Sequence, residues 1–203
     1  MEHFKGLSNK FFIALMFCLF LVLTTSGQRK HIIVSHEFKE FNELINKAGI
    51  VFTMPEGFKE IKPLNTDETS FDYGITIPGV EFEIWFDIRP YKQSQIEAYR
   101  TSTNPDSVYI NWGKAQAAAF SADNNFYTRT IRAENLADYN ADWGRTYFMA
   151  LNDSPYTRHY KYALLITLQK DHTGTIIAEC LTNERGPDFF QNINKARNCI
   201  KFK

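Results

Sequence analysis

The segment from Glu81 to Asp87 carries the acidic residues best placed for catalysis. Glu81 and Glu83 are two residues apart in an alternating stretch, so both carboxylates would project from one face of a strand. A retaining glycosidase uses such a pair as nucleophile and acid. One hypothesis is therefore a small carbohydrate-active hydrolase using Glu81 and Glu83. The alternative is that these residues form the solvated face of a hairpin strand.

Three aromatic residues are candidates for ligand contact. Trp85 could act as a stacking platform for a glycan without any hydrolysis. Tyr139 and Trp143 lie in the segment Tyr139-Asn140-Ala141-Asp142-Trp143-Gly144, where charged residues flank Trp143 and Gly144 permits a close backbone approach. The alternative for Trp143 is a structural corner with its ring packed inward.

Two cysteines, Cys180 and Cys199, remain once an expected export signal is removed, because Cys18 lies inside that signal. In an oxidising compartment they favour a disulfide, which closes a loop of about 20 residues and contributes roughly 3 kcal/mol. The alternative is a pair of separate buried thiols that pack as small apolar groups. Neither cysteine belongs to a C-x-x-C pair or has the spacing of a zinc site.

Signatures of other chemistry are missing from the sequence. It has no G-x-S-x-G elbow, H-E-x-x-H motif, glycine-rich phosphate loop or EF-hand loop. The histidines outside the expected signal fall in the polar start, at a strand start or in a predicted turn, where solvated side chains are the better interpretation: His31, His36, His159 and His172. We therefore expect no metal and no cofactor.

Composition and the N-terminus indicate where the protein acts. The 203 residues include 44% hydrophobic and 15% aromatic residues, and 23 basic residues balance 23 acidic ones, so no net charge attracts nucleic acid. Residues 1–27 resemble a signal peptide: Lys5 and Lys10 precede an apolar run from Phe11 to Leu23 that is too short to span a bilayer as a helix. The alternative is an uncleaved anchor. We expect an exported protein, periplasmic or extracellular, without membrane association after cleavage.

Residues 28–203 should form one α+β domain. The safest element is a hairpin in which two alternating strands are joined at Pro78-Gly79. Helices inserted between hairpins indicate a largely antiparallel sheet flanked by helices, and the apolar sheet face should be covered by the second and third helices. The predicted helices cover 36–48, 104–122 and 187–198, and the predicted strands cover 50–54, 71–77, 80–88, 126–133, 146–151, 160–168, 175–181 and 200–202.

The stretch Phe52-Thr53-Met54-Pro55-Glu56-Gly57-Phe58 resembles the start of PsbP-like domains, where a strand runs into a Pro-x-Gly-aromatic turn. Those domains usually have Trp where this chain has Phe58. They are also similar in having a central antiparallel sheet between helices and in closing with a helix and a short strand, here Phe189–Phe202. The resemblance implies a PsbP-like sandwich with an accessory or binding role and no common catalytic set.

Together these observations favour an exported, soluble binding or accessory protein without catalytic activity, with the hydrolase as the alternative. We expect a monomer whose partner is another protein or a small-molecule or glycan ligand. The ligand would meet an aromatic-lined face of the sheet or the crevice between sheet and helix. A purely structural subunit of an envelope assembly is a third possibility.

Overall fold

A computed structural model describes residues 35–63, 71–91 and 107–203, so the expected signal peptide and the predicted helix start at Asn104-Pro105 lie outside the described residues. Residues Ser35–Lys203 form one compact unit. Its elements, in chain order, are α2 (His36–Lys47), β1 (Ile50–Phe52), β2 (Lys59–Ile61), β3 (Tyr73–Thr76), β4 (Phe82–Pro90), α4 (Ser107–Phe120), β5 (Ser121–Thr130), α5 (Ala133–Tyr139), β6 (Trp143–Leu151), the 3₁₀ turn η1 (Pro155–Thr157), β7 (Tyr162–Lys170), β8 (Gly174–Thr182), α6 (Pro187–Ala196) and β9 (Ile200–Phe202).

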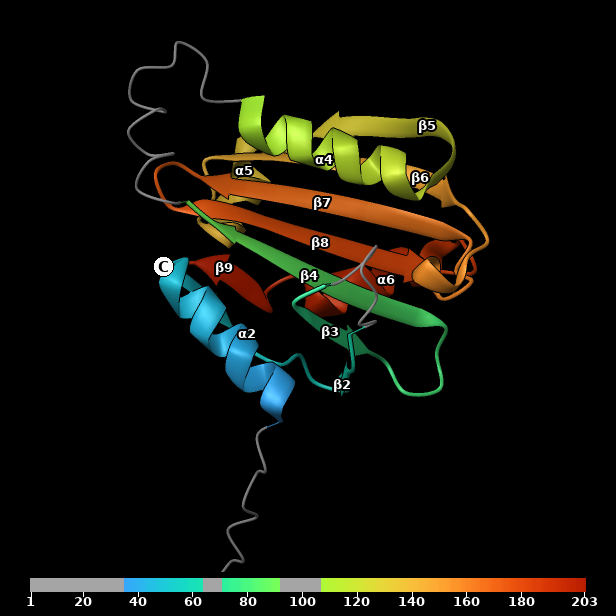
Figure 1. The fold of residues 1–203 in the computed structure, drawn as a ribbon, viewed down its shortest axis with the longest axis horizontal. Helices are drawn as coiled ribbons and strands as arrows, with labels where there is room; N and C mark the ends of the chain where they lie inside the picture. The colour runs from blue at the N-terminus through green and yellow to red at the C-terminus, as the bar shows by residue number, and fades with distance from the viewer. Residues whose placement is uncertain (1–34, 64–70, 92–106) are drawn as a thin grey trace, which may run out of the picture. The chain divides into compact units, whose positions relative to one another are not determined.

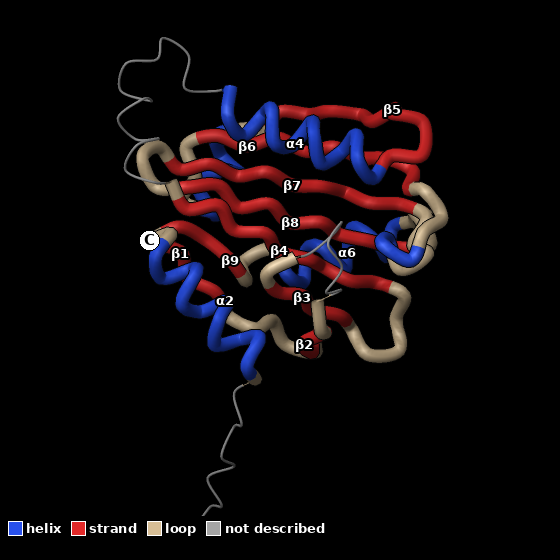
Figure 2. Tube along the Cα trace, viewed as in Figure 1, coloured by secondary structure: helices blue, strands red, loops and turns tan. Residues whose placement is uncertain are grey.

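Seven strands form one antiparallel sheet in the order β2-β3-β4-β8-β7-β6-β5. A second, two-stranded sheet joins β1 to β9, so the two ends of the described unit pair with each other. Figure 2 shows the seven strands side by side, with the β1–β9 pair next to α2. The predicted α+β class with a largely antiparallel sheet is confirmed.

The hairpins follow from local sequence. Strands β3 and β4 pair with Ile75 opposite Ile84, and the turn between them contains Gly79 at φ 78°, a backbone conformation that favours glycine. Strands β7 and β8 are joined by a turn that contains His172 at φ 59°. Alternation along these strands places apolar side chains on both faces of the sheet.

Helices cover both faces of the sheet, which differs from the sequence prediction. Figure 1 shows α4 on the near side of the sheet and α6 on the far side. We call these the α4 face and the α6 face. On the α6 face, Phe41 of α2 and Phe189 of α6 join the apolar side chains of β4 in one core. The predicted pair of covering helices therefore lies on opposite faces rather than on one.

The side of β4 that was expected to be solvated belongs to the α4 face and is buried. Glu83, Trp85 and Asp87 are 9%, 2% and 8% exposed, because they pack against Arg158, the ring of Phe71 and Arg89. Helix α4 lies on the same face, over β5, β6 and β7. The fit of this helix is close: a Cβ on Gly113 would lie 2.5 Å from the ring of Tyr147. The absence of a side chain at Gly113 thus allows the close contact between this helix and the sheet.

Candidate binding groove

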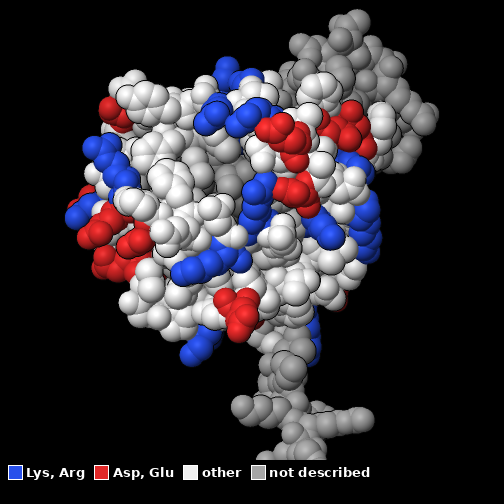
Figure 3. Space-filling model, turned by 180° about the vertical axis from the view of Figure 1, so that it is seen from behind, with Lys and Arg blue, Asp and Glu red and all other residues white. Residues whose placement is uncertain are grey.

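A large groove opens on the α6 face. It lies between the sheet and helices α5 and α6, and its volume is about 720 Å³. Figure 3 shows this side of the molecule, with Lys and Arg side chains around an uncharged hollow. The groove, called here the α6 groove, is lined by Tyr127, Thr128, Arg129, Thr130, Ile131, Arg132, Asn135, Tyr139, Thr146, Phe148, Leu164, Ile166, Phe190, Ile193, Asn194 and Arg197.

The sheet register builds the floor of the groove. Phe148 of β6 pairs with Tyr127 of β5 on one side and with Leu164 of β7 on the other, so the three side chains form one row across the sheet. Two residues further along, Arg129, Thr146 and Ile166 form a second row. The β6 and β7 residues of both rows are half-buried, whereas Tyr127 of β5 is 83% exposed. The floor is therefore apolar, and its outer edge is aromatic and basic.

Arginine side chains line the rim of the groove, and they differ in whether a carboxylate pairs with the guanidinium. Arg132 forms an ion pair with Glu134 at 3.1 Å. Arg197 contacts Asp138 at 2.5 Å and donates to Asn135 Oδ1 at 2.8 Å. The Arg129 guanidinium has no ion-pair or hydrogen-bond partner among the described residues. An anionic group in the groove would find this guanidinium available, and charge-assisted hydrogen bonds to Arg are among the strongest that proteins make.

A second hollow of about 380 Å³ continues the groove along the strands, because Tyr127 and Phe148 line both. In this second hollow the ring of Tyr162 stacks on Phe148 with centroids 6.3 Å apart, and the Arg185 guanidinium lies 5.4 Å from the Tyr162 ring. The combined trough has aromatic rings along its length and a cation near each end. That lining suits a ligand with an apolar body and an acidic group.

The three predicted contact residues do not come together. Tyr139 lies in the α6 groove, where burial raises the pKa of its phenol. Trp85 lies on the opposite side of the sheet, the α4 face, where its ring stacks on Phe71 with centroids 4.7 Å apart and donates to Glu83 Oε2 at 2.7 Å. At 2% exposure its ring is not accessible to a ligand in this structure.

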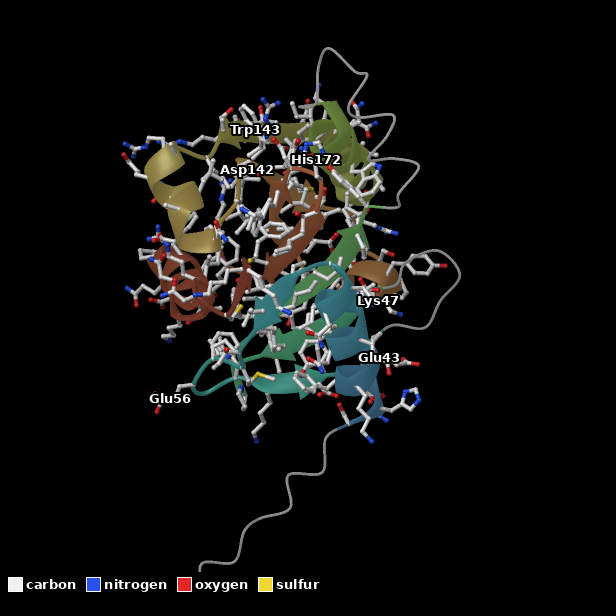
Figure 4. The ribbon with its side chains drawn as sticks, turned by 90° about the vertical axis from the view of Figure 1, so that its left-hand side faces the viewer. Glu43, Lys47, Glu56, Asp142, Trp143 and His172 are labelled. Carbon is white, nitrogen blue, oxygen red and sulfur yellow. The ribbon has the colours of Figure 1, made fainter. Side chains whose placement is uncertain are left out.

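Trp143 lies at a corner beside the β7–β8 turn (Figure 4). Its ring nitrogen donates to Asp171 Oδ2 at 3.3 Å, and the backbone amide of Asp171 donates to Asp142 Oδ2 at 2.8 Å. The side chain is 38% exposed. Trp143 thus links the start of β6 to the turn, and it stands on the α4 face, away from the groove.

The two acidic residues of the hydrolase hypothesis have different surroundings. Glu81 is exposed and lies just before β4. The Glu83 carboxylate is held by Arg158 Nη1 at 3.2 and 3.3 Å and by the indole of Trp85. The Arg158 guanidinium also lies 5.8 Å from the rings of Phe71 and Trp85. These contacts join η1 to the sheet and occupy the Glu83 oxygens.

Three further carboxylates lie on the α4 face, and sequence analysis gave none of them a role. Burial raises the pKa of Asp72 to about 6, and it raises the pKa of Asp87, to which Asp72 is hydrogen bonded. Arg89 pairs with Asp87 at 2.5 Å and opposes that rise. Burial also raises the pKa of Glu179 to about 8, although Gln116 Nε2 donates to it at 2.7 Å. This acidic layer is visible only in the structure, because the sequence alone gives no sign that the strand face is covered.

The predicted disulfide is not formed. Cys180 of β8 and Cys199, between α6 and β9, are both buried free thiols in the core of the α6 face. Burial raises the pKa of both thiols, that of Cys199 to about 12, so both stay protonated and pack as small apolar groups.

The described residues contain no cluster of three or more His, Cys, Asp or Glu side chains that could hold a metal ion. His159 contacts Asp153 at 2.6 Å and His36 contacts Glu40 at 3.5 Å, all four side chains being largely exposed. His31 lies outside the described residues. Within the same part of the chain, no helix is long and apolar enough to cross a membrane.

Comparisons with known proteins give a distant structural similarity. No protein-family model matches the chain, and no curated protein matches its sequence. The solution structure of cyanobacterial PsbP (CyanoP) from Synechocystis sp. PCC 6803 is similar, with 12% identity and a TM-score of 0.43 over 77% of this chain and 88% of that one. Similarity at this level is silent about ligand and activity. The resemblance to the PsbP-like fold that the sequence predicts is found, as a distant structural similarity.

Proposed function

We propose that this chain is an exported binding protein and that the α6 groove is its ligand site. The observation that carries the proposal is the open apolar floor made by Phe148, Leu164 and Ile166 beside the unpaired guanidinium of Arg129. A volume of about 720 Å³ lies in the range of small-molecule sites. Export is supported by the signal-like segment at 1–27.

The lining specifies the chemistry of the ligand. Apolar side chains and the rings of Tyr127, Tyr139 and Phe190 would cover a hydrophobic body, and Arg129 would pair with a carboxylate, sulfonate or phosphate. We assign binding rather than turnover, because the described residues that line the groove offer arginine, amide, hydroxyl and apolar groups without a carboxylate or histidine among them. An accessory role in an exported assembly would use the same groove to hold an acidic, apolar segment of a partner.

A matched pair of fluorescent probes tests the proposal. The probe 1-anilinonaphthalene-8-sulfonate has an apolar body and an anionic group, and N-phenyl-1-naphthylamine has the same rings without the sulfonate. We expect the sulfonate probe to bind the folded protein. Arg129→Gln should lower the affinity for the sulfonate probe by roughly tenfold, since the charge-assisted contact is removed. The affinity for the neutral probe should stay almost unchanged.

Phe190→Ala should lower the affinity for both probes several-fold, because the ring of Phe190 is 49% exposed and lines the groove. The control variants are Val80→Ala, an apolar side chain 44% exposed outside the groove, and Lys59→Gln in β2. If the control substitutions lower probe affinity as much as the groove substitutions do, the α6 groove is not the binding site. The same conclusion follows if none of the four substitutions changes probe affinity.

A further inference from the structure

Strand β5 forms one edge of the seven-stranded sheet and has β6 as its single neighbour among the described residues. Figure 1 shows it at the margin of the sheet, beyond β6. Its last five residues, Phe126-Tyr127-Thr128-Arg129-Thr130, are regular, since the irregularity in pairing lies between Ser121 and Phe126. An exposed edge of this kind is a template for another strand unless proline, lysine or a bulge interrupts it. None of these occurs between 126 and 130.

The register shows which backbone groups of β5 are free to pair. The amide of Ile131 donates to Gly144 O, so Ile131 is in a hydrogen-bonded pair with β6. Because such pairs alternate along antiparallel strands, Tyr127 and Arg129 also bond inward to β6. The amides and carbonyls of Phe126, Thr128 and Thr130 therefore point outward, away from the sheet.

We propose that the occupant of this edge is a second copy of the same chain, joined through a twofold axis at Thr128. In an antiparallel pairing centred there, Thr128 bonds to Thr128 of the other copy, and Phe126 bonds to Thr130. Every outward amide and carbonyl from 126 to 130 then has a partner. The same pairing sets Tyr127 directly opposite Arg129 of the other copy, in the pair type whose side chains lie closest.

The side chains on this edge are complementary under that twofold axis. Tyr127 is 83% exposed, and the Arg129 guanidinium has no partner among the described residues. Each ring would lie against a guanidinium from the other copy, a favourable cation–π contact that occurs twice by symmetry. On the α4 face, Thr128 meets Thr128, a pair that stabilises neighbouring strands. A shift of register by two residues would place Tyr127 opposite Tyr127 or Arg129 opposite Arg129 and lose both contacts.

The helices leave room for this dimer. Helix α4 packs over β5, β6 and β7, and strands lie about 4.8 Å apart. Two helices centred over the β6 strands of the two copies would be roughly 14 Å apart, beyond the 8–10 Å of packed helices. The dimer would have a continuous sheet with both α6 grooves on one side, and Tyr127 and Arg129 of each copy would lie where the two grooves meet. Tyr127 and Arg129 also line the α6 groove, so the dimer and the groove share these two residues, but the backbone pairing rests on the β5 edge and not on what the groove binds.

Sedimentation velocity of the purified protein from about 1 μM to 1 mM tests the proposal. A contact of five residues per copy is small, so we expect a dimer that dissociates with a Kd on the order of tens of micromolar. Thr128→Pro removes an outward amide that β6 does not use, and it should weaken the dimer at least about tenfold without unfolding the monomer. Thr128→Val retains the amide and should stay within about threefold of the parent protein.

The pairing of Tyr127 with Arg129 has its own test. Tyr127→Arg sets two arginines opposite each other and should weaken the dimer at least about tenfold. The double substitution Tyr127→Arg with Arg129→Tyr restores an aromatic ring opposite a guanidinium and should recover the parent Kd. Circular dichroism and thermal unfolding confirm that each variant is folded. A protein that is monomeric up to 1 mM, a dimer that survives Thr128→Pro, or a double variant that stays monomeric would each overturn the proposal.

Discussion

Replacing Glu179 by Gln is expected to stabilise the protein at alkaline pH and to leave its stability nearly unchanged at acidic pH. Glu179 lies on the α4 face of β8, is 6% exposed and accepts a hydrogen bond from Gln116. Burial raises its pKa from the ordinary 4.5 to about 8. Between these values the folded protein keeps a proton that the unfolded chain has lost, so the free energy of unfolding falls as pH rises.

The size of the effect follows from the pKa difference. The folded and unfolded values differ by about 3.5 pH units, and each unit corresponds to about 1.4 kcal/mol. The buried carboxyl therefore costs roughly 5 kcal/mol at most above pH 8, and relaxation of the surroundings reduces this value. Glutamine has a similar shape, carries no charge and offers the same oxygen to Gln116. We expect the variant to be about 2–5 kcal/mol more stable than the parent at pH 9 and within about 1 kcal/mol of it at pH 4.5.

Urea unfolding at these two pH values, followed by far-ultraviolet circular dichroism, measures the difference. The carboxyls of Asp72 and Asp87 also have raised pKa values, but both are present in parent and variant, so their contribution largely cancels. Glu81→Gln is the control, because Glu81 is exposed. If the stability of the Glu179 variant changes with pH in parallel with that of the parent protein, Glu179 is ionised in the folded state and the reasoning is refuted.

Two further substitutions test the packing of the α4 face. Gly113→Ala should destabilise the protein by about 1–3 kcal/mol in thermal unfolding, because the added methyl group meets the Tyr147 ring, whereas Gly186→Ala, with nothing within 4 Å, should change stability little. Equal effects of the two glycine substitutions would contradict the close contact between α4 and the sheet. Arg158→Ala should cost about 3 kcal/mol by leaving the Glu83 carboxylate without its ion pair, and Glu83→Gln in the same chain should recover part of that loss. A double variant no more stable than Arg158→Ala would show that the pair is not coupled.

The parts of the fold that could be predicted from sequence are those with strong local patterns. The hairpin at Pro78-Gly79 and the helix at His36–Lys47 were predicted close to their observed bounds, because alternation, turn residues and helical spacing are local signals. Helix α5 and strand β2 were missed, since both are short. Strand β5 was expected to begin at 126 but begins at Ser121, where an irregular pairing breaks the pattern.

The candidate site was less predictable than the fold. Tyr139, a predicted contact candidate, lines the α6 groove. The floor of the groove is made by Phe148 and Ile166, whose sequence pattern is that of ordinary strand residues. The face on which Trp85 lies was expected to meet solvent, but Phe71 and Arg158 pack against the Trp85 ring and bury it. Alternation along a strand shows that two faces differ, but which helix covers which face depends on contacts between distant segments.

The most direct test of the central claim is a titration of the ¹⁵N-labelled protein with 1-anilinonaphthalene-8-sulfonate, followed by amide chemical shifts. Binding in the α6 groove predicts saturable shifts concentrated in β5, β6, β7 and α6, around Tyr127, Phe148 and Phe190, with small changes in β2 and α2. Shifts concentrated along α4, or spread evenly over the protein without saturation, would contradict the proposal that the α6 groove is the ligand site.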